Sequence, residues 1–384
     1  MRKTLSRMDK PLLIITIAFF IFGLIMILSA SSMESYMRYG SSPYYYFIRQ
    51  AIFLACGTVL AFIIIKIPIS KYRILSKLAI LGSIIALAGL TIYGYAANNA
   101  QSWFQIGPLS IQPSEFAKIA IILYLALYYD ENKDKLDNQW TLIKPLLLCV
   151  IIFFLIAMQP DLGTAMVIAL LTIIIFYSVP MKKSYRKLFN RIFLGAIAIV
   201  VAILVTTGGS ILRSYQLERF NFIDPCDRYQ EESGYQLCNS FIAFHNGGIT
   251  GQGIGQSTQK YLYLPESYTD FIFPIIVEEW GLLVGAIIII VYGVILYRLL
   301  RLAKRATNLR NAMITYGVFA YILLHIAINL IGVMGLGPLT GIPLPFLSYG
   351  GSYTLSMIIA LSLVQRVAIE TNIDTVKKEK KRRR

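Results

Sequence analysis

The chain has 384 residues, of which 57% are hydrophobic and only 15% carry a charged side chain. A typical soluble domain is about 25% charged, so this composition excludes an ordinary soluble protein and favours a polytopic helical membrane protein. The net charge of +16 at pH 7 is also typical of nucleic-acid-binding proteins, but here the basic residues follow a membrane topology instead.

Apolar runs long enough to cross a bilayer recur along the whole chain. With a cytoplasmic N-terminus, 29 of the 36 Lys and Arg residues fall on the cytoplasmic side, as the positive-inside rule requires. The C-terminus is then cytoplasmic too. We predict an all-α fold in which residues 1–370 form one integral membrane domain and the basic tail 371–384 lies along anionic lipid. The ten predicted transmembrane helices lie near residues 11–30, 50–67, 78–97, 113–129, 144–159, 162–180, 189–207, 271–297, 312–336 and 352–370.

Two acidic motifs stand at the entrances of predicted spans. In IQPSEFAK, Pro113 suits a first helical turn, and Glu115 and Lys118 then share one face at i and i+3. Ionisable residues at membrane depth favour a functional role, and the alternative is a structural ion pair that orients two helices. In QPDLGTA, Asp161 is either a functional acid or an N-cap that accepts hydrogen bonds from the first turn.

The large outer segment 208–270 lies between predicted helices 7 and 8. Loops of this length are usually functional or disordered, and this segment is too rich in aromatic residues to be disordered. Arg213 and Arg219 are expected near the membrane surface. Cys226 and Cys238 form either a disulfide or two free thiols. The stretch HNGGITGQGIGQS either cradles phosphate oxygens with its backbone amides or is a flexible turn.

The segment YLPESYTDFIFPIIVEEWG contains four carboxylates at the junction of the outer segment and the next span. Asp270 lies at the membrane surface, and Glu266 is a loop residue expected to shape the acceptor site. Glu278 and Glu279 lie about two turns deeper. Because neighbouring helical residues diverge by about 100°, at most one of these two faces a cavity, and the other is expected to pair with a neighbouring helix.

The chemistry that these residues offer is that of carboxylates and cations at an outer membrane surface. The two histidines and four cysteines match no recognised zinc spacing, and His325 and Asn329 are expected to hydrogen-bond between helices. A carboxylate supplies a general base, and Lys or Arg stabilises a departing phosphate. This combination suits group transfer from a lipid-linked pyrophosphate, and it also suits binding such a lipid for export.

Several long motifs in order resemble the SEDS family (shape, elongation, division and sporulation), which contains FtsW, RodA and SpoVE. They are AQSWFQIGPLSIQPSEFAKIAIILYLA, QPDLGTA, GYQLCNSFIAFHNGGITGQGIGQSTQKYLYLPESYTDFIF, EEWG and GPLTGIPLPFLSYGGS. The fragments resemble the division and sporulation branch more than RodA. The chain departs from the family pattern at Tyr268, Asn239 and Pro274, and none of these departures removes a carboxylate or the lysine.

The resemblance implies a peptidoglycan glycosyltransferase that polymerises lipid II at the outer face of the bacterial cytoplasmic membrane. It implies that Asp270 is essential for catalysis, that Glu115 and Lys118 are linked to activity and substrate contact, and that Asp161 is the acid of the QPD motif. The implied partners are lipid II, a class B penicillin-binding transpeptidase and membrane proteins of the divisome or elongasome.

The resulting hypothesis makes Asp270 the general base towards the 4-hydroxyl of the acceptor sugar. Glu115 would hold Lys118 charged. Lys118, Arg213 and Arg219 would offset the pyrophosphate charge, with or without a divalent cation such as Mg or Mn. The other residues assigned to substrate binding are Asp161, Lys260, Glu266 and Ser348. Export of lipid II by a flippase, and a scaffold that only recruits the transpeptidase, are the alternatives.

Overall fold

The computed structural model describes residues 6–40, 42–93, 95–97, 100–107, 109–207 and 214–382. Within them, seven helices are long and apolar enough to cross a membrane. They are α2 (Lys10–Tyr39), α3 (Tyr45–Lys66), α4 (Tyr72–Tyr93), α6 (Gln139–Ala157), α11 (Ile272–Arg305), α12 (Leu309–Val333) and α13 (Gly351–Arg382). Three further helices, α5 (Pro113–Glu131), α7 (Leu162–Tyr177) and α8 (Lys183–Thr206), occupy the remaining predicted spans.

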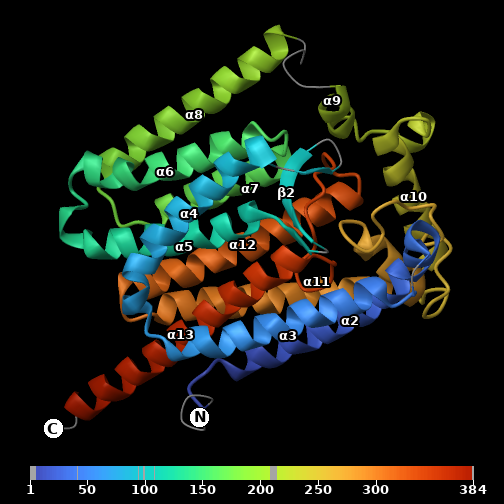
Figure 1. The fold of residues 1–384 in the computed structure, drawn as a ribbon. Helices are drawn as coiled ribbons and strands as arrows, with labels where there is room; N and C mark the ends of the chain where they lie inside the picture. The colour runs from blue at the N-terminus through green and yellow to red at the C-terminus, as the bar shows by residue number, and fades with distance from the viewer. Residues whose placement is uncertain are drawn as a thin grey trace.

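The long helices lie side by side in a bundle whose two ends differ (Figure 1). Both chain termini lie at one end, and the short elements of the outer segment lie at the other. These elements are α9 (Ser214–Phe220), the 3-10 turn η3 (Pro225–Arg228) and α10 (Glu232–Gly247). Short 3-10 turns at Ile69–Lys71 and Lys133–Lys135 connect helices at the end that carries the termini.

A small antiparallel sheet joins the outer end of the bundle, where the sequence analysis placed the end of the span at 78–97 and the connection to the span at 113–129. Its strands β1 (Tyr95–Ala97), β2 (Ala100–Ile106) and β3 (Leu109–Ile111) follow one another in space, and Phe104 pairs with Ile111. The span predicted at 78–97 is therefore wrong at its end, because α4 stops at Tyr93. The alternating polar residues of AQSWFQI are typical of a strand with one solvent-exposed face.

Side-chain caps set where several helices begin. Asp9 accepts a hydrogen bond from Leu12 N at 3.0 Å at the start of α2. Asp161 accepts from Thr164 N at 3.0 Å and so begins α7. Each cap satisfies one of the backbone donors that a helix start leaves free, which matters most where a membrane offers no water.

Helices α12 and α13 form the centre of the bundle. They bury 61% and 78% of their most apolar windows, whereas the other five candidate spans bury 28% or less. Polar residues on α12 therefore face protein and not lipid. This position matters because α12 carries His325 and Asn329 through the middle of the fold.

Helix α11 is broken at Gly281, whose φ of 83° lies outside the helical region. A Cβ at this position would lie 2.2 Å from Ile249 O, so only glycine fits without displacing the backbone. The break leaves helical carbonyls and amides without their usual partners. In a membrane protein such groups must be satisfied by other parts of the chain.

The glycine-rich segment 248–253 supplies those partners. Gln252 N and Gly253 N donate to the carbonyls of Glu278 and Glu279 at 2.9 and 3.0 Å. In return, Leu282 N donates to Gly248 O at 2.9 Å. The amides at 252 and 253 are therefore engaged by α11, so the phosphate-cradle interpretation of this stretch is wrong for them. Its glycines allow close backbone approach instead.

Candidate functional site

Asp270 lies two residues before α11, at the end of the outer segment, with its side chain partly exposed. Thr269 Oγ1 is 2.7 Å from Glu266 Oε2 and 3.0 Å from Asp270 Oδ1, so its hydroxyl bridges the two carboxylates. The backbone of Asp270 is fixed by Asn329, whose Nδ2 donates to Asp270 O at 2.7 Å. A loop acid is thus anchored to the central helix of the bundle.

The environment of Asp270 raises the pKa of its carboxyl from 3.8 to about 7. Burial is the main cause, and the neighbouring charge of Glu266 adds to it, whereas the charge of Arg219 lowers the pKa. A carboxylate with a pKa near the working pH is well matched to proton transfer. The acidity of Asp270 is therefore compatible with proton transfer near neutral pH.

A pH profile follows from this shift. A base works only when deprotonated, so we expect any reaction that uses Asp270 as base to slow as the pH falls through about 7. Replacing Glu266 with Gln removes a negative neighbour, lowers the pKa of Asp270 and moves this acidic limb to lower pH. The effect is measured by initial rates from pH 5 to 9 for the wild type and Glu266→Gln. If the two rates fall over the same pH range, the expected shift is contradicted.

The predicted Glu115–Lys118 pair is present on α5, with Lys118 Nζ 2.8 Å from Glu115 Oε1. Both side chains are buried, and that of Lys118 is 0% exposed. Lys118 Nζ also lies 3.1 Å from His325 Nε2, and Tyr321 donates to Glu115 Oε2 at 3.4 Å. In this conformation the ammonium is enclosed by protein and is engaged by Glu115 and His325.

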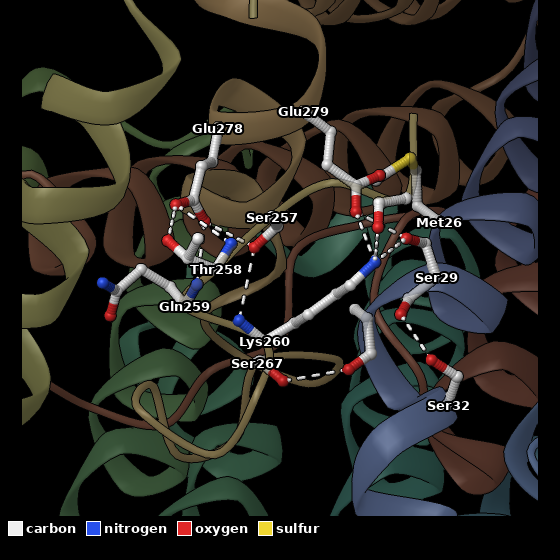
Figure 2. Close-up of polar contacts among 12 residues, drawn as sticks. Met26, Ser29, Ser32, Ser257, Thr258, Gln259, Lys260, Ser267, Glu278 and Glu279 are labelled. Carbon is white, nitrogen blue, oxygen red and sulfur yellow. Dashed lines mark hydrogen bonds and ion pairs between the residues drawn. The ribbon is translucent and has the colours of Figure 1, made fainter. Parts of the chain in front are cut away.

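The two acids of α11 hold the outer segment in place (Figure 2). Glu278 accepts hydrogen bonds from Asn246 Nδ2 at 3.0 Å, Thr258 Oγ1 at 2.8 Å and the Ser257 hydroxyl. Glu279 accepts from Lys260 Nζ at 3.0 Å and from Ser29 Oγ on α2 at 2.5 Å. The neighbouring-helix contact predicted for one of them is thus made by Glu279, while Glu278 binds the segment 257–259.

A mutation at Glu278 tests whether its carboxylate holds residues 257–259 in place. Replacing Glu278 with Ala leaves several buried donors unsatisfied, each at a cost of about 1–3 kcal/mol. We expect amide hydrogen exchange in residues 257–260 to accelerate at least about tenfold, because about 1.4 kcal/mol corresponds to a factor of ten. The matched control is Glu232→Ala, an exposed acid at the start of α10. If amide exchange in residues 257–260 is unchanged in Glu278→Ala, Glu278 does not hold this segment in place.

Two residues assigned to substrate binding have structural contacts instead. Lys260 is 5% exposed and donates to Glu279, Ser29 Oγ and Gly255 O. Ser348 is 2% exposed, and its hydroxyl accepts from Leu344 N at 2.8 Å within the same loop. These contacts hold the two side chains within the fold, and their assignment to substrate binding stays a prediction.

The remaining predicted residues lie around the outer end. Asp161 caps α7, and Gln112 Nε2 lies 3.5 Å from its second oxygen. Arg219 is half-buried on α9 and acts electrostatically on Asp270. Arg213 lies outside the described residues. Cys226 and Cys238 are joined as a disulfide that ties η3 to α10.

Within the described ranges, no three His, Cys, Asp or Glu side chains come together as a metal site. The carboxylates of Asp270 and Glu266, bridged by Thr269, are a partial donor set for a hard cation such as Mg or Mn.

Comparison with known proteins places this geometry in a family. The FtsW/RodA/SpoVE family model, described as cell cycle protein, matches residues 10–373. The chain belongs to this family. The SEDS resemblance is confirmed, and with its apolar helices the chain is a multi-pass bacterial membrane protein.

Relatives of the family match nearly the whole chain. The probable peptidoglycan glycosyltransferase FtsW of Bacillus subtilis is 36% identical over 386 residues, covering 99% of this chain and 95% of the relative. The stage V sporulation protein E of the same organism is 34% identical over 365 residues, with 94% and 96% covered. Both relatives are similar to this chain along nearly their full length.

Solved structures of the family share the fold. A chain from a structure described as the structural coordination of polymerization and crosslinking by a peptidoglycan synthase complex superposes with a TM-score of 0.74 at 26% identity, covering 95% of this chain and 98% of that one. The rod shape determining protein RodA of Thermus thermophilus superposes with a TM-score of 0.66 at 23% identity, with 94% and 96% covered. The latter likeness concerns the fold alone.

Proposed function

We propose that this SEDS protein is a peptidoglycan glycosyltransferase that polymerises lipid II into glycan strands during cell division or cell-wall growth. The observation that carries the proposal is Asp270: a partly exposed carboxylate with a pKa near 7, anchored to the central helix at one end of the bundle. Full-length similarity to relatives named as probable peptidoglycan glycosyltransferases supports the substrate class.

The proposed topology places this site outside. Ten helices cross the cytoplasmic membrane, both termini are cytoplasmic, and the segment 208–270 faces outward. The membrane domain covers residues 1–370, and the tail 371–384 follows the inner leaflet. The positive-inside distribution of Lys and Arg supports this orientation. An aqueous sugar and a membrane-bound pyrophosphate can then meet at Asp270.

In the proposed reaction, the Asp270 carboxylate takes the proton of the 4-hydroxyl of the acceptor lipid II. The hydroxyl oxygen forms a bond to the anomeric carbon of the donor chain. The bond from that carbon to its pyrophosphate oxygen breaks, and undecaprenyl pyrophosphate leaves with the electron pair. Arg219, whose charge already acts on Asp270, is suited to offset the pyrophosphate charge, together with Arg213.

We further propose that the protein works beside a class B penicillin-binding transpeptidase, with other membrane proteins of the divisome or elongasome. The superposed chain from a peptidoglycan synthase complex supports such an assembly. The 36% and 34% identity to the FtsW and SpoVE relatives supports a role in division or sporulation.

Polymer formation from lipid II in detergent tests the function. A glycosyltransferase makes glycan chains in detergent, whereas a flippase has no leaflet to cross there and makes none. The purified protein is assayed with its transpeptidase partner, and the products are separated by gel electrophoresis. Absence of glycan chains, together with lipid II translocation in vesicles, would favour the flippase.

A further inference from the structure

Helix α12 carries three polar residues on one buried stripe. Tyr321, His325 and Asn329 follow one another at i, i+4 and i+8, so they lie on the same face. They are 0%, 0% and 3% exposed. Polar groups are costly to bury unless they are hydrogen-bonded, so a continuous buried stripe needs partners along its whole length.

The middle residue, His325, connects two segments that lie far apart in the sequence. Its Nδ1 lies 3.3 Å from Pro343 O, and because a carbonyl only accepts, Nδ1 carries the hydrogen. Its Nε2 is then the acceptor for Lys118 Nζ at 3.1 Å. The ring stacks on Tyr353 with centroids 4.9 Å apart. His325 thus joins the Glu115–Lys118 pair to the loop after α12.

The last residue, Asn329, connects the same loop to Asp270. Its Nδ2 uses both hydrogens, donating to Asp270 O at 2.7 Å and to Ile342 O at 2.8 Å. Its Oδ1 is buried without a partner. A cavity of about 10 Å³ beside it is lined by Asp270, Thr340 and Gly341, among others. The amide nitrogen is therefore the group that holds the two segments together.

His325 and Asn329 bind neighbouring carbonyls, those of Pro343 and Ile342. Gly341, in the same loop, lies beside the Asp270 carboxylate: a Cβ built on Gly341 would be in van der Waals contact with Asp270 Oδ2, at 3.8 Å. A shift of either stripe residue therefore moves the surface against which the Asp270 carboxylate rests.

We propose that His325 and Asn329 are positioning residues that lock residues 341–343 and the backbone of Asp270 to α12, so that the placement of the Lys118 ammonium and of the Asp270 carboxylate is set by one stripe. This inference rests on the proposed function. It assigns the buried ion pair a part in the reaction without requiring that Lys118 touch the substrate.

The stripe is tested with near-isosteric variants in the lipid II polymerisation assay. Asn329→Leu keeps the approximate volume but removes both donors, and His325→Leu removes donor and acceptor. Because a misplacement of about 1 Å can cost about 100-fold in rate, we expect each to lower kcat by about 10- to 100-fold, with KM for lipid II little changed. His325→Gln can still accept from Lys118 and donate to Pro343 O, so it should recover most of kcat.

Control variants separate positioning from a general packing defect. Ile331→Ala changes a residue on α12 that is 43% exposed, and we expect native kcat. Unfolding temperature and co-purification with the transpeptidase report folding. If Asn329→Leu does not fold, the kcat values of His325→Gln and His325→Leu alone test the positioning role.

The outcomes distinguish the inference from the proposed function. If the wild type makes no glycan, the proposed function fails. If the wild type is active but Asn329→Leu keeps native kcat, or His325→Gln is as slow as His325→Leu, the positioning role is overturned. We also expect the double variant His325→Leu with Asn329→Leu to lose less than the product of the single losses, because both residues hold the same loop.

Discussion

Replacing Asp270 with Asn is expected to abolish glycan polymerisation while the protein still folds. The amide has nearly the same shape, and the bond from Asn329 to the backbone carbonyl of residue 270 is unaffected by it. The change removes only the group that accepts the proton, a contribution of about 10²–10⁴-fold. The measurement is the rate of glycan chain formation by the purified variant with its transpeptidase partner.

The matched control is Asp227→Asn, which neutralises an exposed acid of the same outer segment. Both variants remove one carboxyl from the same outer segment, so at a pH above 7, where both acids are ionised, a general electrostatic effect would slow them equally. Native rates in Asp270→Asn would show that the carboxylate is not the base. Equal losses in both variants would assign the effect to surface charge.

A second large effect is expected at the buried ion pair. Lys118→Met leaves the Glu115 carboxylate in the protein interior, where Tyr321 still donates to it. Removing one member of a buried pair costs about 3–5 kcal/mol. We expect Lys118→Met to lower the free energy of unfolding by that amount and to lose activity, as measured by denaturant unfolding in detergent and by polymerisation.

The double variant Lys118→Met with Glu115→Gln separates stability from function. It buries no charge, so most of the lost stability should return. Activity should not return, because His325 still lacks the ammonium that it accepts from. A double variant that polymerises at the native rate would show that the pair only orients helices, which is the structural alternative.

Local signals in the sequence predicted much of the fold. Apolar length located the helices, and the i, i+3 spacing of Glu115 and Lys118 placed them on one face, where they pair. The N-cap interpretation of Asp161 also corresponds to the observed contact. These features depend on residues within one or two helical turns, so periodicity contains the information needed to predict them.

Long-range contacts were not predictable in the same way. The glycines near residue 250 suggested a phosphate cradle, but the amides of Gln252 and Gly253 donate to carbonyls of α11, which lie some 25 residues later. Lys260 was assigned to substrate, but its partner is Glu279. The predicted hydrogen bond between helices is confirmed for His325, which contacts Lys118, whereas Asn329 binds carbonyls of two loops. The i, i+4, i+8 spacing with Tyr321 could have indicated the full stripe. Spacing identifies a face but not what packs on it.

The break in α11 also constrains how the protein is made. Until segment 248–253 docks, the carbonyls of Glu278 and Glu279 and the amide of Leu282 lack the partners that the finished fold gives them. Exposing such groups to lipid costs several kcal/mol. In the proposed topology, this segment is made before α11 and crosses the membrane first. Translocation of the outer segment is then a precondition for stable insertion of the helix that follows it.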